Sequence, residues 1–381
     1  MNNEVQQQGY QHKCQNCGSS LRFDAESGKL FCEHCKSHFE FDQSTAVMER
    51  DFADLVTFSP WDESKVAFYR CQNCGASTVL PRTSLATECP FCQSPFVADE
   101  TATGMVRPDS LIPFEFTDKE AAKQLTRWRK RRLFAPNKFR KRTKEKGIKG
   151  VFVPTWTFDA VTLSNYSGTL GKRRTRTVRR NGKTHTETYI HWFSVSGDIT
   201  MTFDDIFVRA NDNITDGYFN KLQPYDKSKY VVYSDEYLAG YIADNYTIDP
   251  LDAFQIARKR MDDRIRSAIM SKYNADVQGT LMVDTQETQK SFKYMMLPVY
   301  VASTKYHGKL YSQYVSGVYS DAKRTKAKIA GKSPVSFWKV LATVLAGIAA
   351  VVGIYLLVCH VNGTQPFDFL MQADQVKNLI G

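Results

Sequence analysis

Eight of the nine cysteines in this 381-residue chain fall into two sets that share one spacing. In each set a Cys-x2-Cys pair is followed, after fourteen residues, by a second Cys-x2-Cys pair. The second set lies 57 residues after the first, and its flanks repeat as well, KCQNCGS against RCQNCGA. The pattern indicates an internal duplication, whose two sets are Cys14, Cys17, Cys32 and Cys35, and Cys71, Cys74, Cys89 and Cys92.

This spacing is typical of zinc ribbons. A Cys-x2-Cys knuckle lets two thiolates bind one ion from a tight turn, and two knuckles on adjacent hairpins complete a tetrahedral four-sulfur shell around Zn²⁺. Gly18 and Gly75 follow the first knuckles, where a positive φ is easiest for glycine. Protein sulfur fills all four positions, so we expect two structural zinc ions whose binding drives the folding of the ribbons.

The remaining candidate ligands are not needed for these shells. His12, His34 and His38 lie near the first set, and we expect them at the surface. Cys359 is the unpaired ninth cysteine, at the far end of an apolar segment. A disulfide framework is the alternative, but thiols in a cytosolic chain stay reduced.

Zinc ribbons bind nucleic acid in some proteins and protein partners in others, and the fold alone does not determine which of the two is bound. Between its knuckles the first ribbon has Arg22 and Lys29 against Asp24 and Glu26. The second ribbon has Arg82 against Glu88. Neither has the dense basic face of a phosphate-binding ribbon, which favours contact with protein.

Positive charge is concentrated in three other segments. The chain has a net charge of +11, yet residues 127–149 alone carry twelve Lys or Arg and one acid. Residues 172–183 add seven bases and residues 323–339 add six, both without an acid. Such patches indicate a localised anionic partner, either lipid headgroups or nucleic acid, unless they are only solvated. The candidate contacts are Arg127, Arg129, Lys130, Arg131, Arg132, Arg140, Lys141, Arg142, Arg173, Arg174, Arg176, Arg179 and Arg180.

One segment has the length and composition of a membrane span. Val340 to Cys359 is twenty residues without a charge, enough for a helix to cross a hydrocarbon core of about 30 Å. Six bases precede it between residues 323 and 339, and beyond it only Lys377 is basic. The positive-inside rule predicts a single-pass protein with cytoplasmic N-terminal domains and a C-terminal tail outside.

Between the ribbons and this span the composition is that of an α+β domain. Thr117 to Glu120 is a capping box that opens a helix, and Asp249-Pro250 opens another. In the second helix, Leu251, Phe254, Ala257, Met261, Ile265 and Ile269 share one face. Strands are expected at residues 151–158, 281–283, 294–306 and 310–319, the last two joined at His307-Gly308. A long hairpin is expected over residues 163–199, with Asn181-Gly182 as its turn.

The predicted class is multidomain: two small β zinc ribbons, an α+β domain and one C-terminal transmembrane helix. A polar tail (1–12) precedes the first ribbon (13–43), a linker (44–69) and the second ribbon (70–99). The α+β domain (105–322) leads through a basic juxtamembrane segment (323–339) to the span (340–359) and a short tail (360–381).

No catalytic constellation stands out. The phosphate-binding, nucleophile-elbow, zinc-protease and dinucleotide motifs are missing. The pairs Asp204-Asp205 and Asp262-Asp263 are adjacent in sequence, so their side chains should point to different faces and be solvated. The chain is therefore expected to be non-enzymatic.

The two ribbons, the segments Pro154–Ala160, Leu297–Tyr300 and Gly331–Ser336, and the terminal span occur in an order that resembles a bacterial family of TFIIB-type zinc-ribbon-containing membrane proteins. Some members are labelled primosomal protein N′-like, although helicase motifs are missing here. Some relatives are similar to partners in envelope-stress operons, beside a phage-shock protein A homologue and an SPFH-type protein. The resemblance implies a membrane adaptor.

The leading hypothesis is a non-enzymatic, membrane-anchored zinc-ribbon adaptor or scaffold on the cytoplasmic face of a bacterial membrane. Its ribbons would bind protein, and its basic segments would meet anionic lipid. The rival is a membrane-tethered nucleic-acid-binding protein that uses the ribbons and the basic patches.

Overall fold

The computed structural model describes residues 12–45, 47–56, 66–71, 73–81, 86–92, 94–97, 106–141, 147–180, 183–223 and 225–362. The chain forms two compact units. The first comprises Met1–Leu125 with Lys144–Gly331, and the second Thr126–Thr143 with Lys332–Gly381. Residues 126–143, which the sequence analysis placed inside the α+β domain, thus group with the apolar C-terminal segment.

The first cysteine set lies in a four-stranded antiparallel sheet of order β1-β2-β3-β4. Its strands are His12–Lys13, Ser20–Asp24, Lys29–Cys32 and His38–Phe39. Leu21, Phe23 and Leu30 are buried at alternate positions, as the two-residue period of a strand requires. This is the small β unit that the cysteine spacing predicts.

The second cysteine set is joined to the large sheet of the first unit. β6 (Val66–Arg70) and β7 (Ser77–Pro81) form one hairpin, and β8 (Ala86–Glu88) pairs with β9 (Pro95–Val97). β7 also pairs with β14 (Ile242–Asp244), where Asp244 lies opposite Thr78. Backbone hydrogen bonds therefore hold this ribbon on the larger domain.

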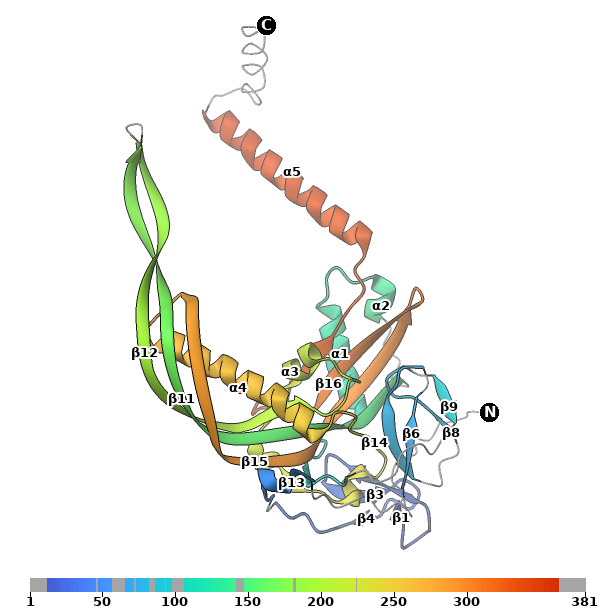
Figure 1. Ribbon diagram of the computed structural model, residues 1–381. Coiled ribbons are helices and arrows are strands. Elements are labelled where there is room, and N and C mark those ends of the chain that lie inside the picture. Colours follow the sequence, from blue (N-terminus) through green and yellow to red (C-terminus); the bar gives the residue numbers. More distant parts are fainter. Residues whose placement is uncertain are drawn as a thin grey trace. The chain divides into compact units, whose positions relative to one another are not determined.

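Three long strands dominate that domain (Figure 1): β11 (Ile148–Arg180), β12 (Lys183–Arg209) and β15 (Val277–Tyr306). β11 lies between the other two and pairs antiparallel with both. The strands expected at residues 151–158, 281–283 and 294–306 and the hairpin expected over 163–199 are parts of these three, whereas the strand expected at 310–319 is separate from them. β16 (Lys309–Tyr319) and β17 (Ala327–Gly331) extend the sheet beyond β15. The predicted turn at His307-Gly308 is confirmed, whereas Asn181-Gly182 lies outside the described residues.

Short elements complete the sheet. β10 (Ser110–Leu111) runs parallel to β15 and pairs with β13 (Val231–Val232). The segment 44–69, expected to link the ribbons, contains β5 (Arg50–Asp51), which pairs with β15, and a 3₁₀ helix, η1 (Phe52–Val56). The remaining short helices are α3 (Asp216–Leu222), η3 (Lys227–Lys229) and η4 (Asp235–Leu238).

The long strands bend where their register shifts. Between Phe158 and Ala160, one residue of β11 faces two of β12, Asp204 and Asp205. One residue further along β11, β15 carries its own extra residue, near Gln289. Asp205 and Gln289 both have positive φ, +52° and +47°. Such bulges bend a strand and increase its twist, which accounts for the curvature of these strands in Figure 1.

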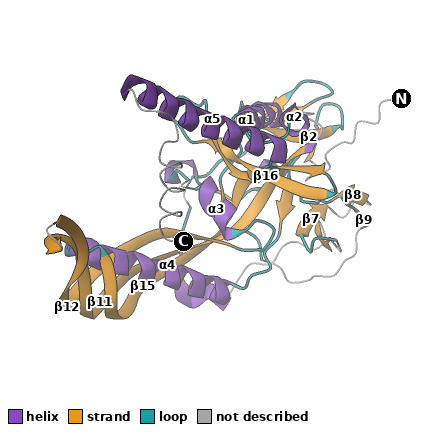
Figure 2. Ribbon diagram, turned by 90° about the horizontal axis from the view of Figure 1, so that it is seen from above, coloured by secondary structure: helices purple, strands orange, loops and turns teal. Residues whose placement is uncertain are grey.

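Helix α4 (Pro250–Lys272) packs along β11, β12 and β15 (Figures 1 and 2). Asp249 caps it by accepting the backbone N–H of Leu251 at 2.9 Å. The predicted apolar face is confirmed from Phe254 to Ile269. The prediction was wrong for Leu251, which is exposed because it lies at the edge of the stripe in the first turn; Ala253 is buried in its place.

The second unit contains the end of α1 (Asp118–Lys130), α2 (Asn137–Lys141) and α5 (Phe337–Asn362). The capping box correctly predicts the start of α1. The backbone N–H of Ser336 donates to the carbonyl of Phe134 at 2.8 Å. The corner between α1 and α2 is therefore fixed to the start of α5, although about 200 residues separate them in the sequence.

Candidate metal centres and charged surfaces

The four thiols of the first set come together at the end of its sheet. Their Sγ atoms all lie within 4.8 Å of one another, and the pairs Cys14–Cys35 and Cys17–Cys32 are each 3.5 Å apart. A tetrahedral zinc with bonds of about 2.3 Å would separate its sulfurs by about 3.8 Å. The donor set and its spacing therefore fit a structural zinc ion.

The second set repeats this arrangement. The Sγ atoms of Cys71 and Cys92 are 3.6 Å apart, and those of Cys74 and Cys89 are 3.5 Å apart. Gly18 and Gly75 have φ of +74° and +77°, as the knuckle turns require. Two four-cysteine groups that could hold metal ions are thus present, and zinc is the ion that such a shell suits.

The polar residues around the thiols repeat as well. Asn16 donates its amide to the hydroxyl of Ser37 at 2.8 Å, and Asn73 does the same to Ser94 at 2.9 Å. Each bond joins the first knuckle of a ribbon to the second. The duplication therefore includes the hydrogen bonds that brace the site, a feature that the cysteine spacing does not reveal.

The thiols of the first ribbon have different environments. Hydrogen bonds from the backbone and hydroxyl of Ser19 lower the pKa of Cys17 to about 5. The hydroxyl and backbone of Ser37 lower the pKa of Cys35, whereas burial raises that of Cys14 to about 11. Because only thiolates bind zinc, Cys17 and Cys35 are prepared for metal and Cys14 would lose its proton on binding.

Both ribbons use one face to pack on the domain. In the first, the buried Phe23 ring lies 5.2 Å from that of Tyr237, and its backbone N–H donates to Ala239 at 2.9 Å. In the second, Cys71 and Cys89 belong to a hydrophobic cluster that includes strands of the large sheet, and the carbonyl of Phe91 accepts a hydrogen bond from Ser303. The ribbons are therefore fixed parts of the first unit.

The opposite face of each ribbon remains accessible. The exposed residues include the tips of the knuckles, Gln15, Asn16, Cys17, Glu33 and His34 in the first ribbon and Asn73 and Cys74 in the second. His34 and His38 are exposed, as predicted, while His12 is half-buried. No described histidine belongs to either four-cysteine group.

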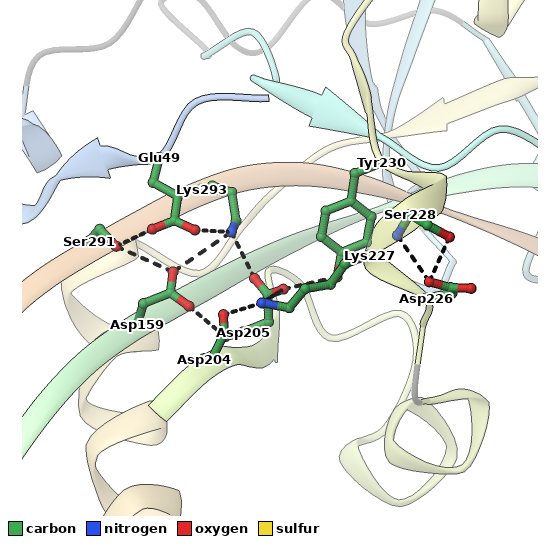
Figure 3. A network of polar contacts seen from close by, with 10 residues as sticks. All are labelled: Glu49, Asp159, Asp204, Asp205, Asp226, Lys227, Ser228, Tyr230, Ser291 and Lys293. Atoms are coloured by element: carbon green, nitrogen blue, oxygen red, sulfur yellow. Dashed lines mark hydrogen bonds and ion pairs between the residues drawn. The ribbon is translucent and has the colours of Figure 1, made fainter. Parts of the chain in front are cut away.

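A buried charged network lies at the bend of the long strands (Figure 3). The ammonium of Lys293, which is only 3% exposed, lies 2.9 Å from Asp205 Oδ1 and 2.9 Å from Glu49 Oε1. It is also 3.8 Å from Asp159 Oδ2. Lys227 contacts both Asp204 and Asp205. Burial raises the pKa of Asp159 to about 6.

The expectation that Asp204-Asp205 is solvated was wrong for Asp205, which is 8% exposed. The bulge and the positive φ of Asp205 let two adjacent carboxylates face one network, which regular strand alternation forbids. Oxygens of Glu49, Asp159 and Asp204 lie close enough to hold a cation. Because two lysine ammonium groups already lie among these carboxylates, the network is better explained as ion pairs.

The basic candidates divide into exposed and internal groups. Arg129 was wrongly expected at an anionic surface, because it is buried with its guanidinium 5.0 Å from the ring of Phe139. Arg140 is half-buried and donates to the carbonyl of Lys130 at 2.8 Å. The side chain of Lys141 and the whole of Arg142 lie outside the described residues. The exposed candidates are Arg127, Lys130, Arg131, Arg132, Arg173, Arg174, Arg176, Arg179 and Arg180.

Arg173 to Arg180 belong to a two-stranded arm, residues 172–180 and 183–191 of β11 and β12. β15 stops pairing with β11 at Gly171, so no third strand supports the arm. None of its described side chains is buried. Glu187 lies 3.2 Å from Arg176 and 3.8 Å from Arg180, which leaves most of the positive charge of the arm uncompensated.

Helix α5 has the properties of a candidate membrane span. It is 26 residues long, and its most apolar window has a mean hydropathy of 2.5. None of that window is buried. Within the described part of the chain it is the one helix long and apolar enough to cross a membrane.

Comparison with known proteins finds a relative along almost the whole chain. YdjG of Bacillus subtilis (strain 168), described as an uncharacterized protein, is 29% identical over 343 residues, which cover 89% of this chain and 94% of YdjG. No protein-family model matches the chain, and no solved structure does. The similarity extends over most of the chain and assigns no activity to it.

Proposed function

We propose that this protein is a non-enzymatic adaptor, anchored by α5 on the cytoplasmic face of a bacterial membrane, whose zinc ribbons bind protein partners. The observation that carries the proposal is the exposure of α5. A window with a mean hydropathy of 2.5 and no buried residue leaves a large apolar surface uncovered in water. A lipid bilayer is the environment that such a helix suits.

The adaptor role is supported by the ribbons. A four-sulfur shell leaves no open metal position, so zinc there would fix a shape and could not activate a substrate. Each ribbon is held by one face and presents its knuckle tips at the other. The described parts of the ribbons contain no dense basic surface. A rigidly mounted, weakly charged surface is better suited to protein than to phosphate.

The family resemblance suggests which partners to look for first. A phage-shock protein A homologue and an SPFH-type protein are the candidates, and an envelope-stress response is the proposed setting. The proposed cytoplasmic orientation is supported by the six bases between residues 323 and 339, compared with the single base after the span.

The test is co-purification of the full chain from detergent-solubilised bacterial membranes, followed by mass spectrometry. The exposed knuckle residues are changed in a His34→Ala/Lys36→Glu variant, and Lys13→Glu is the matched charge change at an exposed site outside the knuckles. We expect specific proteins with the wild type and with Lys13→Glu, and their loss with the knuckle variant at unchanged zinc content. Partners retained equally by all three would contradict ribbon-mediated binding.

A second function is favoured by one observation, the exposed basic arm of β11 and β12. A two-stranded ribbon can enter the major groove of DNA, and the arm carries seven Lys or Arg against one acid. Binding through it should weaken log-linearly with salt. We expect only non-specific binding, with a Kd no better than about 10⁻⁵ M near physiological salt. Sub-micromolar, sequence-dependent binding would favour the nucleic-acid function instead.

A further inference from the structure

The corner between α1 and α2 is held against the first turn of α5 by a lysine. Three acceptors surround the Lys339 ammonium: the carbonyl of Ala135 at 2.8 Å, Asn137 Oδ1 at 2.8 Å and the carbonyl of Leu133 at 3.4 Å. All belong to the second unit. Lys339 therefore positions the corner.

This corner exposes apolar side chains beside the candidate span. Leu133 is 71% exposed, and Phe134 is exposed as well. At the start of α5, Phe337 and Trp338 are 70% and 75% exposed, and their rings lie 5.7 Å apart. The corner thus adds apolar surface at the level where α5 begins, next to the aromatic side chains typical of a membrane interface.

Cations accompany this apolar surface in the same unit. The exposed ones are Arg127, Lys130, Arg131, Arg132 and Lys138, and residues 121–144 contain no acid. Two contacts connect α1 with α2: Arg129 is buried against the ring of Phe139, and Arg140 donates a hydrogen bond to the carbonyl of Lys130. The exposed cations therefore lie on a corner whose two helices are fixed to each other. Anionic phospholipid headgroups attract Lys and Arg near a membrane surface.

We propose that the α1–α2 corner is a second membrane contact, in which Leu133 and Phe134 enter the interface beside α5 and the surrounding cations bind anionic phospholipid headgroups. The inference rests on the proposed anchoring by α5. Nucleic acid would engage the cations and leave Leu133 and Phe134 exposed to water. A bilayer can accommodate the apolar side chains in its interface and bind the cations through its headgroups. The proposed anchoring by α5 holds the corner next to that bilayer.

Photo-crosslinking of the full chain in vesicles tests this directly. p-Benzoylphenylalanine replaces Phe134 in the corner or Leu345 in α5, where the native side chains are both exposed. The vesicles contain phosphatidylcholine with about one third phosphatidylglycerol, since anionic lipid is what the cations should select. We expect phospholipid adducts at both positions.

The two crosslinking positions distinguish the proposed corner contact from the proposed anchoring by α5. Adducts at position 345 without adducts at 134 would overturn the corner contact and leave the anchor intact. No adduct at either position would overturn both. At position 134 phosphatidylglycerol should be enriched at least about twofold over its bulk fraction, because each nearby cation favours anionic lipid. Arg127→Gln/Lys130→Gln/Arg131→Gln should abolish this enrichment, and Arg127→Lys/Arg131→Lys, which keeps the positive charges, should not.

Nucleic acid is tested with the same preparation. Duplex DNA added to the full chain in neutral vesicles should leave the adducts at position 134 unchanged. Sub-micromolar DNA binding that is lost in the Arg127→Gln/Lys130→Gln/Arg131→Gln variant, with no selection of phosphatidylglycerol, would assign the corner to nucleic acid and overturn the lipid contact.

Discussion

Replacement of Lys293 by methionine should destabilise the first unit strongly. Methionine keeps the length and most of the apolar stem but removes the ammonium, which lies 2.9 Å from both Asp205 and Glu49 and 3.8 Å from Asp159. Asp159 and Asp205 are both 8% exposed, so water cannot replace the lost cation at little cost. The carboxylates of Asp159 and Asp205 would then share a buried site that has lost one of its positive charges.

The size of the effect can be bounded from the network. Breaking a buried ion pair by removing one partner costs about 3–5 kcal/mol of the free energy of unfolding. The lower end applies here, because Lys227 still lies 3.1 Å from Asp205. Loss of the ion pair with Glu49 contributes little to this cost, because the side chain of Glu49 is partly solvated and water screens its charge. We therefore expect Lys293→Met to cost about 3 kcal/mol at neutral pH.

The cost should depend on pH in a defined direction. Burial raises the pKa of Asp159 to about 6, and removal of Lys293 should raise it further. A carboxyl whose pKa is higher in the folded than in the unfolded state contributes stability that is present at low pH and lost as pH rises through the folded-state value. The penalty of Lys293→Met should therefore be smaller at pH 5 than at pH 8.

Urea unfolding of the full chain in detergent micelles, followed by pulse proteolysis at both pH values, measures this. Lys309→Met, at an exposed lysine of the paired strand β16, is the matched control and should change the free energy of unfolding by less than about 0.5 kcal/mol. Asp205→Asn added to Lys293→Met should restore part of the loss. A cost below about 1 kcal/mol, or one that does not change with pH, would refute the proposed role of the network.

Three further outcomes follow from the structure. Purified protein should contain about two zinc ions, and Cys14→Ser/Cys17→Ser should contain about one by elemental analysis; one or none in the wild type would contradict two complete shells. Phe23→Ala removes the ring that packs on Tyr237 and should cost about 3 kcal/mol in the same urea assay while both zinc ions remain; no loss would mean that the first ribbon is not docked. Protease added to intact spheroplasts should trim only residues beyond α5, whereas digestion of the ribbons would reverse the orientation.

Local patterns predicted the parts of the structure that depend on nearby residues. The Cys-x2-Cys spacing indicated two four-sulfur groups because each knuckle is a single turn. The face of α4 from Phe254 to Ile269 followed from a period of 3.6 residues. The turn at His307-Gly308 needed only residues that tolerate positive φ.

The parts that were missed depend on pairing between distant segments. Asp205 is buried because an extra residue in β12 breaks the alternation that the sequence analysis assumed. Arg129 looks like its basic neighbours in sequence, yet the ring of Phe139 on the next helix covers it. The bond from Ser336 to Phe134 joins segments that are about 200 residues apart, and no local pattern predicts such a contact.

The most direct test of the adaptor function is site-specific photo-crosslinking at the first ribbon in living bacteria, with p-benzoylphenylalanine in place of the exposed His34. We expect discrete protein adducts in the membrane fraction that disappear in the Cys14→Ser/Cys17→Ser variant, because the knuckle tip needs its metal to keep its shape. Absence of protein adducts from the wild-type ribbon, or adducts to nucleic acid in their place, would contradict the adaptor function.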